Sequence, residues 1–313
     1  MSPRLTAPTS LRRSRAQPLP AWKYLDWMGW HDQGDGKLML GINVEQGRIK
    51  DTPEVQLKTV LRKLVDTYDL DMILTPSQSI VLRDIKPSDK YDVEAMLKAH
   101  GVLLIHEIDA LTRKSIACPA FPLCGLAMTE AERVQPEINA RLNALLRSMG
   151  MANDDFVTRT TGCPNGCARP YMAELAFVGS GPNAYQVWLG GSPDQAERTA
   201  QPTSIFKMPF DDLEKTIEPI FAMWKSQRLT PDEALGDFAH RVGIAAVEEF
   251  MGTYSPGDFA KLPNPFAPEP MPAPDSSVGI DAALLAKLAE EASARDIEPA
   301  ALLDMIVREA IEG

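Results

Sequence analysis

The sequence of 313 residues has few of the features that mark specialised classes of protein. It contains only four cysteines, too few for a scaffold held together by disulfides. No apolar run approaches the roughly 18 residues that a membrane-spanning helix needs. The 20 glycines show no period of three, which excludes a collagen-like chain. With 44% apolar and 24% charged residues the composition is globular, and the length allows two domains and a short appendage.

Acidic residues are absent from the first 20 positions, although the whole chain has a net charge of −11. These positions contain Arg4, Arg12, Arg13 and Arg15. We therefore expect residues 1–21 to form a basic, disordered lead-in, with a transit peptide as the alternative. Because no secretory signal is seen, we expect a cytoplasmic protein with free or metal-bound thiols, or one of the plastid stroma if the lead-in is a transit peptide. The acidic balance disfavours nucleic-acid binding, and no membrane partner is expected.

Short strands and helices alternate in residues 22–110. A strand is predicted over residues 37–44, and two more, joined by a turn, over residues 71–85. Amphipathic spacing predicts helices over residues 55–68 and 91–99. The order strand, helix, strand, strand, helix is typical of an α+β unit rather than of a series of parallel crossovers.

All four cysteines lie in a second region, residues 111–250. Apolar patterning predicts helices over residues 130–149 and 210–224. Strands are predicted over residues 175–178 and 185–189, on either side of a glycine-rich turn. The region is therefore expected to contain both helices and strands.

A proline-rich linker, residues 251–277, follows the cysteine region. Seven prolines lie between Pro256 and Pro274, which favours an extended spacer. After it, the apolar pattern of residues 278–313 predicts a helical hairpin. A helical pair of this length buries too little apolar surface alone, so we expect the tail to self-associate or dock.

The cysteines form two close pairs. Five residues separate Cys118 from Cys124, three separate Cys163 from Cys167, and 38 lie between the pairs. Zinc knuckles usually have tighter spacing than the first pair, and no histidine lies beside either pair. Four thiolates suit an iron–sulfur cluster, and the glycines at 162 and 166 would let backbone N–H groups turn toward the sulfurs. The alternative is four buried thiols that act as small apolar side chains.

Longer motifs around these cysteines resemble a known family. Residues 117–133 (ACPAFPLCGLAMTEAER) and 161–175 (TGCPNGCARPYMAEL) are similar to the two cysteine motifs of assimilatory sulfite reductases. Residues 177–191 (FVGSGPNAYQVWLGG) resemble the ferredoxin-dependent branch of the nitrite/sulfite reductase family. Residues 29–37 (GWHDQGDGK) and 74–78 (LTPSQ) match upstream.

The resemblance implies two coupled cofactors. The four cysteines match the ligands of a [4Fe–4S] cluster, and Cys167 matches the ligand whose sulfur also binds the iron of sirohaem. Asn165 and Arg169 flank this cysteine and are candidates to contact sirohaem carboxylates; for Arg169 a structural ion pair is the alternative. In the family, ferredoxin delivers six electrons singly, and they pass from cluster to haem to sulfite, which becomes sulfide.

The matched region, about residues 17–250, corresponds only to the C-terminal half of a sulfite reductase. The family fold contains two pseudo-repeats, each with a ferredoxin-like half-module and a larger α/β domain. The basic residues that hold sulfite in the family come largely from the other half, so no catalytic residue is identified in this half. Lys37, Arg48 and Arg83 are interpreted as solvated charges on strands.

Three interpretations follow from the match to one half. The chain is a split or truncated ferredoxin-dependent enzyme that needs a separate N-terminal half, a non-enzymatic iron–sulfur or sirohaem-binding protein, or a nitrite reductase of the same superfamily. In the first case the surface that packs against the other half would be exposed, which predicts poor solubility or self-association. The expected fold is α+β: a ferredoxin-like half-module (residues 22–110), an α/β cofactor domain (residues 111–250) and a helical hairpin.

Overall fold

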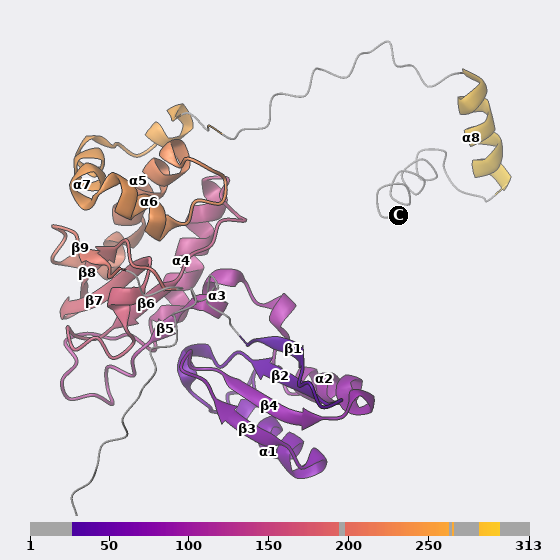
Figure 1. Ribbon diagram of the computed structural model, residues 1–313. Coiled ribbons are helices and arrows are strands. Elements are labelled where there is room, and N and C mark those ends of the chain that lie inside the picture. The colour runs from indigo at the N-terminus through magenta and orange to yellow at the C-terminus, as the bar shows by residue number, and fades with distance from the viewer. Residues whose placement is uncertain (1–26, 194–197, 263–264, 266–281, 295–313) are drawn as a thin grey trace, which may run out of the picture. The chain divides into compact units, whose positions relative to one another are not determined.

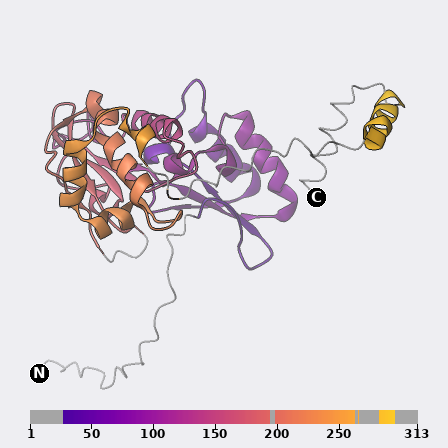
Figure 2. The ribbon, with the colours of Figure 1, turned by 90° about the horizontal axis from the view of Figure 1, so that it is seen from above.

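The computed structural model, shown in Figure 1, describes residues 27–193, 198–262, 265 and 282–294. The chain divides into two compact units, Met1–Pro265 and Phe266–Gly313. The first unit contains two β-sheets, which Figure 2 shows after a turn of 90°. No helix in the described ranges is long and apolar enough to span a membrane.

The first sheet belongs to the half-module. Its elements are β1 (Gly29–Asp32), β2 (Leu38–Ile42), α1 (Leu57–Tyr68), β3 (Asp71–Leu74), β4 (Ile80–Ile85) and α2 (Lys90–Ala99). The strands are antiparallel in the order β1-β2-β4-β3. Alternate residues of the central strands, including Leu40 and Leu82, form one apolar core with Leu64 of α1 and Leu97 of α2.

The second sheet is the centre of the cofactor domain. Its strands are β5 (Ile116–Ala117), β6 (Thr158–Thr161), β7 (Leu175–Gly181), β8 (Ala184–Leu189), β9 (Gln201–Pro202) and β10 (Met208–Pro209). They follow the order β10-β8-β7-β6-β5, with β9 paired to β8. Strands β5, β6 and β7 are parallel to one another, whereas β8 pairs in antiparallel fashion with β7, β9 and β10. The sheet is therefore mixed.

Helices complete the cofactor domain (Figure 1). They are α3 (Ala110–Lys114), α4 (Gln135–Ser148), α5 (Leu213–Gln227), α6 (Leu235–Val242) and α7 (Ile244–Thr253). Short 3-10 helices are η1 (Glu45–Gly47), η2 (Pro87–Asp89), η3 (Ile105–Glu107), η4 (Pro170–Met172), η5 (Phe210–Asp212) and η6 (Asp258–Lys261). The core joins Phe177 and Val187 of the sheet to Leu142 of α4 and Phe221 of α5.

The elements predicted for the half-module are confirmed, with helix bounds that differ by one or two residues. The sequence does not predict β1, because glycine, histidine and aspartate favour turns over strands. The helix predicted from residue 130 begins at Gln135, with Pro136 in its first turn, where a missing N–H costs little. Helices α6 and α7 are not predicted by the sequence pattern.

The structure corrects the predicted domain boundary at residue 250. Helix α7 continues to Thr253, and Tyr254 and Phe259 pack against the core of the cofactor domain. The Tyr254 hydroxyl donates a hydrogen bond of 2.6 Å to the Glu218 carboxylate. Aromatic burial thus extends the cofactor domain into the start of the proline-rich segment.

The second unit is described only in helix α8 (Ala282–Ala294). This helix confirms the first half of the predicted hairpin. The second helix of the hairpin, most of the linker and the basic lead-in of residues 1–21 lie outside the described residues.

Candidate cofactor site around the four cysteines

The two cysteine pairs begin at the carboxyl ends of neighbouring parallel strands. Cys118 directly follows β5, and Cys163 follows β6 after one intervening residue. Because β5 and β6 are parallel, their carboxyl ends meet at the same edge of the sheet. The chain between them contains α4 and forms a β-α-β connection. The 38 residues between the pairs therefore span one crossover.

Backbone contacts at Gly162 hold the two cysteine loops together. Its N–H donates to the sulfur of Cys118 over 3.2 Å. Its carbonyl accepts hydrogen bonds from the N–H groups of Met128 and Thr129, at 2.7 and 3.2 Å. A Cβ at this position would lie only 2.7 Å from the Cβ of Ala120. The expectation that glycine permits close backbone approach to a sulfur is thus confirmed here.

The four thiols differ in exposure. Cys118 and Cys163 are buried, Cys124 is half-buried and Cys167 is exposed. Burial raises the pKa of the Cys118 thiol; two backbone N–H groups lower it, and the neighbouring thiols of Cys167 and Cys163 raise it further. These three thiols therefore lie within electrostatic reach of one another. Cys124 lies further along the loop that begins at Cys118.

Four thiols are the usual ligand set of an iron–sulfur cluster. Within residues 27–193, 198–262, 265 and 282–294, no three Cys, His, Asp or Glu side chains converge closely enough to hold one ion. A [4Fe–4S] cluster holds its ligands further apart, because each thiolate binds a different iron. Bound iron would also offset the cost of keeping thiolates in a buried site.

The two other predicted cofactor contacts lie beside Cys167. Asn165 is exposed, and Arg169 is half-buried with a left-handed backbone conformation (φ 55°). The Arg169 guanidinium donates to the carbonyl of Pro76 in the half-module. Its backbone carbonyl accepts a hydrogen bond of 3.0 Å from Arg159. Arg169 thus joins the second cysteine loop to the half-module through a backbone contact.

The half-module also contacts the strand that carries the first cysteine. The Gln78 side-chain amide donates to the Ala117 carbonyl at 2.7 Å and accepts from the Ala117 N–H at 3.1 Å. Arg48 forms a two-pronged ion pair with Glu132, whose backbone N–H donates to the Cys118 carbonyl at 3.0 Å. The motif LTPSQ contained Gln78, but nothing in the sequence indicated its partner.

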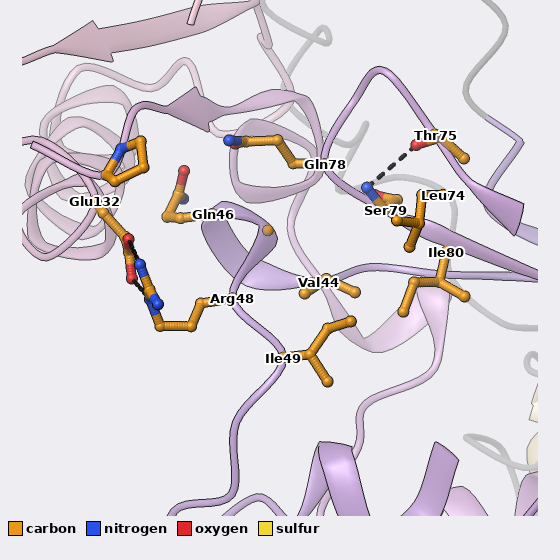
Figure 3. A pocket seen from close by; sticks show the side chains of 12 residues that line it. Val44, Gln46, Arg48, Ile49, Leu74, Thr75, Gln78, Ser79, Ile80 and Glu132 are labelled. Carbon is orange, nitrogen blue, oxygen red and sulfur yellow. Dashed lines mark hydrogen bonds and ion pairs between the residues drawn. The ribbon is translucent and has the colours of Figure 1, made fainter. Parts of the chain in front are cut away.

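A cavity of about 370 Å³ lies beside these contacts (Figure 3). Figure 3 shows the Arg48 guanidinium facing the Glu132 carboxylate at its border. In the described part of the chain, two buried oxygens of its lining, Gln46 Oε1 and Ser79 Oγ, have no hydrogen-bond partner. Pro119, next to Cys118, completes the lining. The half-module and the cofactor domain thus share a partly polar cavity close to the first cysteine.

The interpretation of Lys37 and Arg48 as solvated strand charges holds only in part, because both side chains are partly exposed but each is ion-paired and lies outside a strand. The Lys37 ammonium lies 2.6 Å from the carboxylate of Asp84, and Arg48 is paired with Glu132 across the two domains. Both partners are distant in the sequence, so no local charge pattern identifies them. Arg83 is half-buried on β4.

A buried carboxylate anchors the base of the strand that leads to the second cysteine loop. Glu174 accepts hydrogen bonds from the N–H groups of Val157 (2.7 Å) and Gly236 (3.1 Å). Burial raises the pKa of Glu174 to about 7, although both N–H groups lower it. Val157 immediately precedes β6, and Gly236 lies in the first turn of α6. The carboxylate therefore connects β6 to α6.

Comparison with known proteins identifies the class to which this chain belongs. The nitrite/sulfite reductase ferredoxin-like half domain matches residues 31–100, and the nitrite and sulphite reductase 4Fe-4S domain matches residues 109–257. The chain belongs to the nitrite and sulfite reductase family. The cofactors implied for it are a [4Fe–4S] cluster coupled to sirohaem.

Among curated proteins, the chain is similar to sulfite reductases. It is 48% identical over 236 residues to the sulfite reductase [ferredoxin] of Synechococcus elongatus, covering 75% of this chain and 37% of that protein. It is 36% identical over 223 residues to the sulfite reductase [NADPH] hemoprotein beta-component of Staphylococcus haemolyticus, covering 71% of this chain and 38% of that protein. The chain thus spans less than two fifths of the length of these relatives.

A solved structure confirms the fold. The Mycobacterium tuberculosis NirA protein superposes with a TM-score of 0.60 at 21% identity, over 74% of this chain and 43% of that one. At this identity the similarity supports the α+β architecture alone.

Proposed function

We propose that this chain provides the cofactor-bearing half of a ferredoxin-dependent sulfite reductase, which reduces sulfite to sulfide. The observation that carries the proposal is the position of Cys118 and Cys163 at the ends of two neighbouring parallel strands, in a region similar to such an enzyme. The coupled cofactors would supply single-electron transfer to bound substrate. The residues of this chain hold and shield those cofactors.

The exposure of the cysteines supports separate roles for them. Buried Cys118 and Cys163, together with half-buried Cys124, suit a cluster inside the protein. Cys167 is exposed, so its sulfur is the one most accessible to a second cofactor. Asn165 and Arg169 lie two residues on either side and are proposed contacts for sirohaem carboxylates. The Arg169 guanidinium has five N–H donors, so it can contact a sirohaem carboxylate in addition to its hydrogen bond with the half-module.

The relatives contain a region that this chain does not match. We propose that activity needs a counterpart of that region. Around Cys124, the first cysteine loop exposes four large apolar side chains, with exposed fractions from 39% to 70%. They are Phe121, Leu123, Leu126 and Met128. Contiguous apolar surface of this kind usually marks an interface. A counterpart that covers this loop would also exclude water from the cluster.

The charged groups near the site also support the need for a counterpart. Arg48 is paired with Glu132, Lys37 with Asp84, and Arg169 donates to a backbone carbonyl. An anionic substrate needs cations that are not already neutralised. We therefore assign the sulfite-binding cations to the counterpart and ferredoxin to the assembled enzyme.

The first test is the absorption spectrum of the protein purified without oxygen from a host that makes sirohaem. Sirohaem bands together with about five irons per chain, four in the cluster and one in sirohaem, are expected, because all four thiol ligands are present. The Cys167→Ser variant should lose the sirohaem bands, whereas Ser204→Ala, on the far side of β9, serves as the control. A colourless, iron-free wild-type protein would contradict the proposal.

The second test measures turnover after addition of the unmatched part of the Synechococcus relative. Sulfite reduction with reduced ferredoxin is expected only in the mixture. Faster turnover of nitrite than of sulfite would instead favour the nitrite reductase alternative. A cofactor-loaded mixture without turnover of either anion would favour a non-enzymatic cofactor-binding protein. The cytoplasmic location and self-association through the tail stay predictions.

A further inference from the structure

The second cysteine loop is short and makes few hydrogen bonds of its own. Between Cys163 and Cys167, the loop closes through a contact from the Gly166 N–H to the Cys163 carbonyl at 3.5 Å, the outer limit for a hydrogen bond. Gly166 has a positive φ of 69°, a conformation that glycine adopts without strain. The Gly166 carbonyl also accepts a hydrogen bond of 2.8 Å from the N–H of Arg169, just after the loop.

A tyrosine outside the loop supplies a shorter contact. The Tyr171 hydroxyl donates a hydrogen bond of 2.7 Å to the carbonyl of Pro164, the residue after Cys163. The ring of Tyr171 also packs on Gly166, where a Cβ would lie 2.8 Å from the ring carbon Cε2. One side chain thus contacts the loop at two points between its cysteines.

The sheet in turn fixes Tyr171. Its ring meets the ring of Trp188 on β8 edge to face, with centroids 4.7 Å apart. Its backbone carbonyl accepts a hydrogen bond of 2.7 Å from the Ala200 N–H. Tyr171 therefore transmits the position of a strand of the sheet to the loop between Cys163 and Cys167.

We propose that Tyr171 is a positioning residue that fixes the Cys163–Cys167 loop in the geometry needed to hold the cofactors. This inference rests on the proposed cofactor-bearing function. It predicts that the hydroxyl group matters independently of the ring, because the hydroxyl makes the bond to Pro164 and the ring makes the contact with Gly166. The variant Tyr171→Phe separates the two contributions.

The first experiment needs no cofactor. Hydrogen exchange is measured by mass spectrometry in the cofactor-free protein, on peptides that cover residues 162–169. Tyr171→Phe should raise exchange there by about fivefold, the factor expected from the loss of one ordinary hydrogen bond. The matched control is Tyr254→Phe, which removes a hydroxyl bonded to Glu218 in the helical part of the domain and should leave these peptides unchanged. Equal exchange in wild type and Tyr171→Phe would overturn the inference.

The second experiment uses the cofactor-loaded protein. The electron paramagnetic resonance spectrum of the reduced cluster should change in Tyr171→Phe but not in Tyr254→Phe, and iron release to a chelator should be about fivefold faster. An unchanged spectrum and release rate would overturn the inference while the cofactor proposal stands. If wild type binds no cofactor, the proposed function fails, whereas the exchange measurement still decides whether Tyr171 holds the loop.

Discussion

The two cysteine loops are held from different parts of the molecule. The half-module contacts the first loop and its strand through Gln78 and Arg48, which are distant from the cysteines in the sequence. The second loop depends mainly on residues of its own domain, Tyr171 and the buried Glu174. One cofactor site therefore depends on two largely separate supports, linked by the contact of Arg169 with Pro76, and disturbing one should affect the cysteines unequally.

The largest effect is expected when one cysteine ligand is removed, because this should abolish the difference between the two loops. Because one cluster needs both cysteine pairs, Cys163→Ser should reduce cluster iron from about four per chain to nearly none, although the first pair is intact. Iron and sulfide analysis measures this, and circular dichroism of the variant controls for folding. Retention of half the iron on the first pair would contradict a shared cluster.

The support of the second loop should depend on pH. The pKa of Glu174 is about 7 in the folded protein, above the usual 4.5, so the folded state holds this proton more strongly than the unfolded state. The free energy of unfolding should therefore fall as pH rises from about 4.5 to about 7, by at most about 3 kcal/mol, and then level off.

Glu174→Gln isolates this contribution. It should remove that part of the pH dependence, which urea unfolding at several pH values measures as the difference from wild type. The control is Glu249→Gln, because Glu249 is exposed on α7. If wild type and Glu174→Gln have the same slope, Glu174 does not titrate in this range.

The support of the first loop should fail selectively in Gln78→Leu. Leucine leaves the buried N–H and carbonyl of Ala117 without partners, which should destabilise the protein by about 2 kcal/mol. In the cofactor-free protein, alkylation of Cys118 should become faster than in wild type, with Cys163 unaffected. The exposed Gln201 provides the control variant Gln201→Leu. Equal acceleration at both cysteines would show that the two supports are coupled.

The smallest effect is expected from Arg48→Ala. The Arg48 side chain is 38% exposed, so solvent screens part of its attraction to Glu132, and a loss of about 1 kcal/mol is expected. Arg133→Ala, which removes a more exposed pair with Glu130, should change stability hardly at all. Chemical denaturation measures both. A larger loss in Arg133→Ala would contradict the importance of the contact between the domains.

The sequence predicted the features that local patterns encode. Helix α1 repeats apolar residues at helical spacing, from Leu57 to Leu64, and its existence and length followed from that pattern. The cysteine spacing and the flanking glycines likewise indicated a cofactor site, and Gly162 lies against a cysteine sulfur. These predictions succeeded because the signal and the structure span the same few residues.

The sequence failed where a residue's partner lies far along the chain. Arg48 pairs with Glu132 over 84 positions, and Gln78 contacts Ala117 over 39. The sequence around Glu174 also does not indicate that its carboxylate is buried, because the two N–H groups that make this burial tolerable are distant in the sequence. Such contacts exist only after the two domains and their strands have assembled.

The Gln78 amide has a consequence for the alignment of strand β5. Side chains alternate between the two faces of a strand, so a slip of one residue would turn Cys118 away from the second loop. One N–H and the oxygen of the Gln78 amide are both used by the same residue, Ala117. Only one alignment satisfies both groups while Cys118 faces Gly162. A side chain of the half-module thus fixes the register of the strand that precedes the first cysteine.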